Sequence, residues 1–111
     1  MGHKFDIFDL FTISPSEVKE LFFKELDKRN PDLENIQVFL DSGLVDVHTK
    51  GGEYGWTPLH YAAVRNSLEV AELLISSGAE VNVKTNGGET PLHKAVSQKM
   101  VELLQIHGGA R

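Results

Sequence analysis

The tetrapeptide Thr-Pro-Leu-His occurs twice in this chain, at residues 57–60 and 90–93, and its 33-residue period constrains the fold more than any other feature. A stretch rich in leucine and valine that leads to glycine follows each copy, and a similar stretch at residues 34–43 precedes them. A period of this length is typical of stacked repeats, in which one unit buries its apolar face only against its neighbours. We therefore expect about three copies of one unit, of which only the middle copy is complete.

Each copy of the tetrapeptide predicts the start of a helix. Threonine is a favoured N-cap because its hydroxyl accepts a hydrogen bond from an otherwise unpaired N–H group. Proline suits the first helical position, where its missing N–H costs nothing. The histidine stands where a capping box has Glu or Gln, and its imidazole can reach back to hold the turn. These structural-motif residues are Thr57, Pro58, His60, Thr90, Pro91 and His93.

A second helix and a hairpin complete each unit. Apolar residues at mostly helical spacing predict a helix over residues 68–77. We expect Gly78, like Gly43 and Gly109 in the other units, to end its helix in the left-handed conformation. Asn86-Gly87 then predicts a tight hairpin before the next Thr-Pro.

Small differences in spacing distinguish the units. The first hairpin, around residues 50–54, should be larger than the second, because its unit has one more residue before the Thr-Pro. The last unit is two residues shorter than the middle unit between its proline and its final glycine. We place the missing pair in the turn between the helices, opposite Asn66 and Ser67, so that Ala95 and Val96 remain on the first helix.

Residues 1–30 lack the repeat but predict a helix of their own. Ser14-Pro15-Ser16-Glu17 is a capping box with proline at the first helical position. The helix should cover residues 15–29 and pair with a helix over residues 33–41. The aromatic-rich segment 5–11 is either part of a cap that seals the stack or a docking or self-association face. The predicted helix has an apolar face of Val18, Leu21, Phe22 and Leu26 and a charged face of Lys19, Glu20, Lys24, Glu25 and Lys28.

The order helix, turn, helix and hairpin at this period resembles the ankyrin repeat. The resemblance covers residues 32–111 and includes Gly-Ala and Val-Asn pairs at the expected offsets. It implies an all-α ankyrin-repeat solenoid of about three stacked helix-turn-helix units, with short β-hairpin loops and a helical N-terminal cap. We assign the chain to a cap at 1–31 and repeats at 32–111, divided into 32–50 (second half of a degenerate first repeat), 51–84 (a full repeat) and 85–111 (a short terminal repeat).

Composition and charge exclude several classes of function. The net charge of −5 argues against a nucleic-acid ligand, and the basic residues are scattered, so we expect no basic groove. No apolar run approaches the ~18 residues of a membrane span. The chain has no cysteine, no Gly-rich phosphate loop and no nucleophile elbow, and its five histidines lack partners at metal-ligand spacing. We therefore expect no enzyme, no cofactor, no metal and no membrane partner.

The resemblance implies a surface that binds another protein. Ankyrin-family proteins bind partners mainly through hairpin tips and the exposed residues of the inner helix, which form a concave groove. We favour Trp56 most, because interface anchors are enriched in Trp, Tyr and Arg, although it could instead pack over the neighbouring hairpin. The residues carried over as partner-binding are Lys50, Glu53, Tyr54, Trp56, Tyr61, Val64, Arg65, Lys84, Asn86, Glu89, Lys94 and Gln98.

Together these features favour a protein–protein interaction module that is intracellular and monomeric and presents a preformed groove, so that binding orders few residues. Two alternatives stay open. One is a structural or self-associating ankyrin domain that serves as a regulatory piece of a larger assembly, through segment 5–11 or the short last repeat. The other is a secreted effector, a role in which similar short ankyrin proteins also occur.

The proposed helix start at Thr90 is testable by substitution. Thr90→Val keeps the shape of the side chain but removes its hydroxyl, so the free energy of unfolding should fall by about 0.5–2 kcal/mol. Urea unfolding followed by circular dichroism measures this change. An unchanged midpoint would contradict a helix that begins at this residue.

Overall fold

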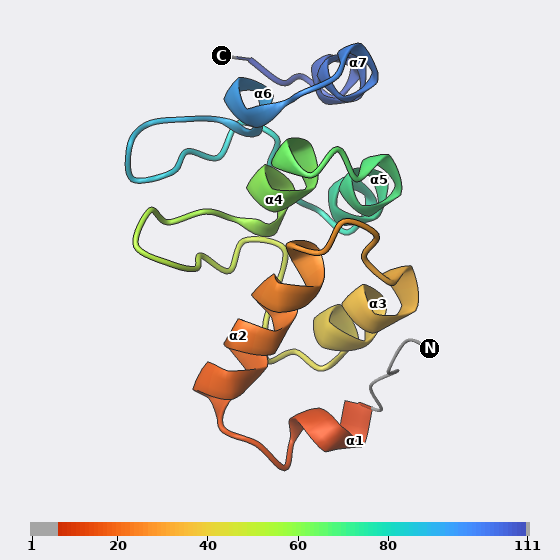
Figure 1. The fold of residues 1–111 in the computed structure, drawn as a ribbon, viewed down its shortest axis with the longest axis vertical. Coiled ribbons are helices and arrows are strands. Elements are labelled where there is room, and N and C mark those ends of the chain that lie inside the picture. Colours follow the sequence, from red (N-terminus) through yellow and green to blue (C-terminus); the bar gives the residue numbers. More distant parts are fainter. Residues whose placement is uncertain (1–6, 111) are drawn as a thin grey trace.

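A computed structural model describes residues 7–110 of the chain, and Figure 1 shows their arrangement. Within these residues there are seven helices and no strand; one antiparallel bridge joins Gly51 and Trp56. The predictions for Phe5 and for the side chain of Phe8 lie outside what the structure describes. The helices are α1 (Ile7–Leu10), α2 (Pro15–Leu26), α3 (Leu33–Asp41), α4 (Pro58–Val64), α5 (Leu68–Ser76), α6 (Pro91–Lys94) and α7 (Gln98–Ile106).

The helices stack as pairs, which confirms the predicted all-α solenoid. Helices α2 and α3, α4 and α5, and α6 and α7 pack against each other, and α4 also contacts α2 and α6. Figure 1 shows α2, α4 and α6 in one row, here called the inner row, and α3, α5 and α7 in a second, outer row. The two long loops project from the inner row on the same side of the molecule.

The helices α2, α4 and α6 start at the predicted caps, and α3 has a cap at Asp32 that was not predicted. The Ser14 hydroxyl accepts a hydrogen bond of 3.2 Å from the Glu17 amide at the start of α2. The Asp32 carboxylate accepts one of 2.9 Å from the Glu34 amide at the start of α3. Thr57 and Thr90 precede α4 and α6 as expected. Caps are predictable from sequence because a side chain and the amides two or three residues later interact locally.

The end of α2 and the environment of Glu25 differ from prediction. The helix ends at Leu26 rather than near residue 29. Glu25, which was predicted on the charged outer face, is 2% exposed. Its carboxylate accepts hydrogen bonds from the Lys28 ammonium at 2.9 Å, the Asp32 amide at 2.9 Å and the Asn35 amide group at 3.2 Å. Burying this carboxylate is tolerable because it is hydrogen-bonded and paired, and the bond to Asp32 joins α2 to the start of α3.

The core lies between the two rows and continues from one pair to the next. The Phe22 and Phe39 rings lie 5.4 Å apart, centroid to centroid, between α2 and α3. Leu59 of α4 and Leu74 of α5 are fully buried in the next layer. Other fully buried side chains include Leu10, Val18, Leu26, Ile36, Met100 and Leu104. Each layer therefore uses its neighbours to exclude water, as expected for stacked repeats.

The last pair corrects the predicted position of the shortening. Helix α6 ends at Lys94; Ala95 is extended and Val96 is 62% exposed. In the middle and the last unit the outer helix starts after an equivalent serine: Ser67 precedes α5, and Ser97 precedes α7. The stretch between the inner helix and that serine is two residues long in both. The missing residues therefore come from the inner helix rather than from the turn.

The final glycine also differs from prediction. The left-handed residue after α7 is Gly108 (φ 91°), and Gly109 instead donates its N–H to Leu104 O at 2.7 Å. With Gly108 aligned to Gly78, the last unit is three residues shorter than the middle one rather than two. A Cβ on Gly109 would lie 2.7 Å from the Leu104 carbonyl oxygen. Gly108 therefore needs glycine for its backbone angle. Gly109 occupies the position of Ala79 in the middle unit, where the same N–H to carbonyl bond is 2.9 Å long.

The predicted hairpins are present, with one change. The first hairpin, residues 51–56, is closed by mutual bonds between Gly51 and Trp56. The second hairpin, residues 85–89, is closed by the Thr85 N–H to Glu89 O bond of 2.9 Å. The first is larger by one residue, as predicted. The left-handed residue of the second is Gly88 (φ 80°), so the loop is the three-residue type that ends in a left-handed glycine.

Phe22 provides a test of this core. Phe22→Ala would leave a cavity between α2 and α3 and should lower the free energy of unfolding by about 3–5 kcal/mol. Phe11→Ala is the matched control, because Phe11 is 58% exposed, and it should cost less than about 0.5 kcal/mol. Urea unfolding of both variants measures the difference. Equal losses would contradict the proposed packing.

Candidate functional site

A cluster of aromatic side chains lies where the first hairpin meets the inner row. The Trp56 and Tyr61 rings are 5.1 Å apart at a steep angle, and Tyr61 lies 5.2 Å from Phe23 of α2. The Lys94 ammonium stands 4.7 Å above the Trp56 ring. Such a cation–π contact contributes about 0.5–1 kcal/mol at an exposed site. Trp56 therefore packs on the scaffold and remains half-buried, so part of its ring still faces solvent.

The two hairpins are joined along their length. The Asn86 amide donates to Tyr54 O at 2.8 Å, and the Asn86 side chain donates to Glu53 O at 3.0 Å. Gly55 (φ 68°) makes this stacking possible, because a Cβ there would lie 2.4 Å from the Asn86 side-chain oxygen. Asn86, expected at the partner surface, thus has a structural bond as well. Tyr54 keeps 69% of its side chain exposed.

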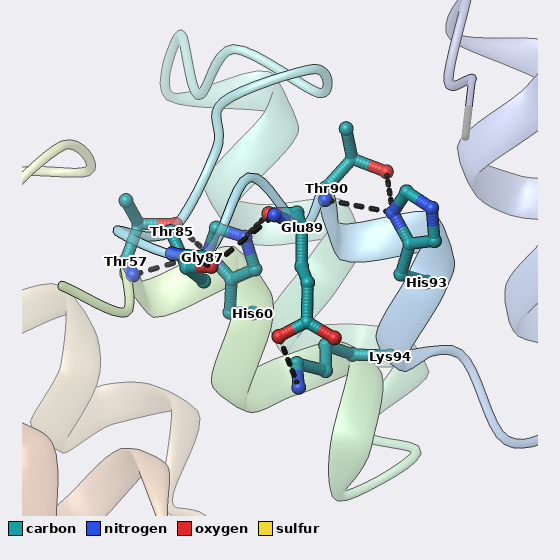
Figure 2. Close-up of polar contacts among 8 residues, drawn as sticks. All are labelled: Thr57, His60, Thr85, Gly87, Glu89, Thr90, His93 and Lys94. Carbon is teal, nitrogen blue, oxygen red and sulfur yellow. Dashed lines mark hydrogen bonds and ion pairs between the residues drawn. The ribbon is translucent and has the colours of Figure 1, made fainter. Parts of the chain in front are cut away.

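His60 connects one repeat to the next, as Figure 2 shows. The Thr57 backbone N–H donates to His60 Nδ1 at 3.1 Å, so Nδ1 carries no proton. Nε2 therefore carries the proton and donates to Glu89 O, 2.8 Å away in the second hairpin. The equivalent His93 accepts from the Thr90 N–H at 3.0 Å but is exposed. One histidine thus serves as a capping group and as a link between repeats.

Two ion pairs border the aromatic cluster. Glu89 and Lys94 lie 2.9 Å apart (Figure 2), and the Lys94 hydrogen bond lowers the pKa of the Glu89 carboxyl. Arg65 and Asp27 are also 2.9 Å apart and join α4 to α2. Burial, followed by the Asp27 charge, raises the pKa of Tyr61, so its hydroxyl stays protonated at neutral pH. These pairs are partly exposed and contribute to orientation more than to stability.

A groove of about 510 Å³ opens between α2 and the first hairpin. Phe23 and Tyr61 contribute its aromatic side chains, and two lysines of α2 lie along it. Its lining is Ser16, Lys19, Glu20, Phe23, Lys24, Asp27, Gly51, Gly52 and Tyr61. This volume lies within the range of about 300–1,000 Å³ that is typical of ligand clefts.

Sequence reasoning missed the contribution of α2 to this groove. The charged face predicted for this helix includes Lys19, Glu20 and Lys24, and all three side chains line the groove. The lining holds two lysines and two carboxylates, so the prediction that no basic groove is present is not contradicted. Phe23 was not assigned to either face. The four-residue spacing of Lys19, Phe23 and Asp27 was the available signal, because residues four apart lie on one side of a helix.

The other predicted site residues are less closely grouped. Val64 is half-buried at the end of α4, and Lys50 and Lys84 are exposed beside the hairpins. Gln98 does not lie on the inner row: it starts α7, where its side chain donates to Glu102 at 3.4 Å. Within residues 7–110 no group of three side chains is placed to hold a metal ion. None of the helices described there is long and apolar enough to cross a bilayer.

Comparison with known proteins gives a consistent result. A family model of ankyrin repeats in three copies matches residues 28–111. An ankyrin repeat protein of Rickettsia bellii is 37% identical over 79 residues, 66% of this chain and 11% of that protein. Human ankyrin repeat domain-containing protein 40 is 32% identical over 75 residues, 68% of this chain and 20% of that protein. The chain thus spans a small part of these two relatives.

The environment of His60 predicts a pH effect on stability. Burial lowers the pKa of His60 from its ordinary value of 6.5. The unfolded chain therefore takes up a proton more readily than the folded one. Stability should be complete above pH 6.5 and decline as the pH falls from there toward the folded-state pKa.

Urea unfolding between about pH 7 and pH 5 measures this decline. His60→Gln should be less stable at neutral pH but should lose less stability on acidification, because glutamine can still cap Thr57 without titrating. His93→Gln is the matched control and should keep the full decline. A decline that is the same in both variants would contradict the assignment to His60.

Proposed function

The chain belongs to the ankyrin-repeat family, and from this premise we propose that it binds another protein through its inner row and its two hairpins. Ankyrin repeats are generally protein–protein interaction modules, and the family is generally non-catalytic. The proposal keeps the division into a cap at residues 1–31 and repeats at 32–111. It also includes an intracellular, monomeric state.

The observation that carries the proposal is the aromatic cluster at the first hairpin. Tyr54 is 69% exposed, and half-buried Trp56 is held between Tyr61 and Lys94. Aromatic side chains that are already fixed lose little conformational entropy when a partner covers them. Tyr and Trp are also the side chains that most often dominate interface energies.

Rigidity of the surface supports the same conclusion. The second hairpin is held to α4 by the His60–Glu89 bond and to the first hairpin by Asn86. The Arg65–Asp27 pair links α4 to α2. These contacts fix the relative positions of the groups that a partner would meet, so the surface is formed before binding.

Substitution of the aromatic residues tests the proposal. Tyr54→Ala and Trp56→Ala should each weaken capture of the partner by at least about 2 kcal/mol if they act as interface anchors. Quantitative mass spectrometry after affinity capture from the native cell identifies the partner and measures the loss. Circular dichroism should show unchanged helicity.

Ile106→Ala is the matched control. Ile106 is 78% exposed on α7 of the outer row, so its substitution removes exposed apolar area away from the proposed surface and should leave capture unchanged. Capture that survives both aromatic substitutions, or that depends on Ile106, would contradict the assignment to the hairpins and inner row.

A further inference from the structure

The groove between α2 and the first hairpin has a fixed aromatic floor. The Phe23 and Tyr61 rings are 5.2 Å apart and come from α2 and α4. The backbone of the hairpin lies directly on Phe23, because a Cβ at Gly51 would be 2.4 Å from Phe23 Cε2. The floor of Phe23 and Tyr61 is therefore in contact with the hairpin wall at Gly51. This contact keeps the aromatic surface rigid, and the surface can receive one apolar side chain.

The charges around this floor favour an anionic ligand. Lys19 and Lys24 are exposed and line the groove. Of the two carboxylates in the lining, Asp27 is neutralised by Arg65 at 2.9 Å, which leaves Glu20. Lys50 precedes the hairpin wall at Gly51. The local balance is thus positive, although the chain as a whole has a net charge of −5.

The outer row has the opposite charge. Its three helices carry five carboxylates and one lysine, namely Glu34, Asp41, Glu69, Glu72, Glu102 and Lys99. An acidic ligand would be repelled there and attracted at the groove. At physiological salt, charges separated by more than about 8 Å are largely screened, so the contacting lysines outweigh the net charge of the chain.

From this arrangement we propose that the groove takes an extended acidic segment of the partner protein, with one apolar side chain on the Phe23–Tyr61 floor and carboxylates beside Lys19 and Lys24. This inference rests on the proposed function and adds the chemistry of the partner. A basic segment would meet like charge at both lysines, and a purely acidic one would leave the aromatic floor uncovered.

Short synthetic peptides test this specificity directly. The first has one leucine between two runs of glutamate, the second has lysine for every glutamate, and the third has serine for the leucine. Titration into the full-length chain, followed by two-dimensional NMR, should show tightest binding of the first peptide. The amide signals of Gly51 and Gly52 should shift, whereas those of Gly78 and Gly108, at the ends of outer helices, should not.

Charge reversal identifies the residues responsible. Lys24→Glu should weaken binding of the first peptide about tenfold, because it replaces an attraction with a repulsion at a contact, and Lys19→Glu should act in the same direction. Lys99→Glu is the matched control, since it changes the net charge equally on the outer row, and it should leave the affinity unchanged. Equal binding of the lysine or serine peptide, or equal loss in Lys99→Glu, would overturn the proposal.

The outcome can be separated from that of the proposed function. If the natural partner is captured through Tyr54 and Trp56 but does not respond to Lys19→Glu or Lys24→Glu, the acidic-segment inference fails and the interaction module stands. In the opposite outcome, the glutamate–leucine peptide binds at Gly51 and Gly52 but capture of the partner does not depend on Tyr54 or Trp56. The acidic-segment inference for the groove is then supported, and the proposed binding surface on the inner row and hairpins is wrong.

Discussion

A pair of short helices cannot bury its own apolar side chains, and the rest of this structure depends on that constraint. Leu59 and Leu74 are fully buried in a layer where α4 packs on α2, α5 and α6, and α5 packs on α4 and α7. The polar link between His60 and Glu89 O works in the same direction, since it holds the second hairpin on the preceding repeat. Stability and relative placement of the repeats therefore come from the same contacts.

The constraint also explains why a surface is left for recognition. The apolar faces of the helices are buried by stacking, whereas the hairpins and the exposed side of the inner row remain accessible to a partner. Aromatic residues at this border serve both purposes: Tyr61 packs between Trp56 and Phe23, and it also lines the groove. A surface built on core contacts is rigid, which favours binding with little loss of conformational entropy.

Features that depend on local interactions could be predicted from the sequence, whereas features that depend on long-range contacts could not. The capping of α2 by Ser14 and of α4 by Thr57 depends on groups within a few residues, and these starts were predicted correctly. The burial of Glu25 was not predicted, because its hydrogen bonds reach Asp32 and Asn35, seven and ten residues further along the chain. Trp56 was chosen as a candidate because it is the chain's only tryptophan, and its role in binding remains a prediction. Phe23 was missed because its partner in the groove, Gly51, lies 28 residues further along the chain.

By itself, the sequence determined the repeat, the helix starts, the hairpins and the family resemblance, because each is encoded by spacing or by residues in local contact. Only the tertiary structure decided that α6 loses a turn while α7 keeps its length, that Glu25 is buried, and that Lys19 and Lys24 face a hairpin. These features depend on contacts between residues that are far apart in the sequence. Such contacts form only when the helices stack, so local sequence patterns do not reveal them.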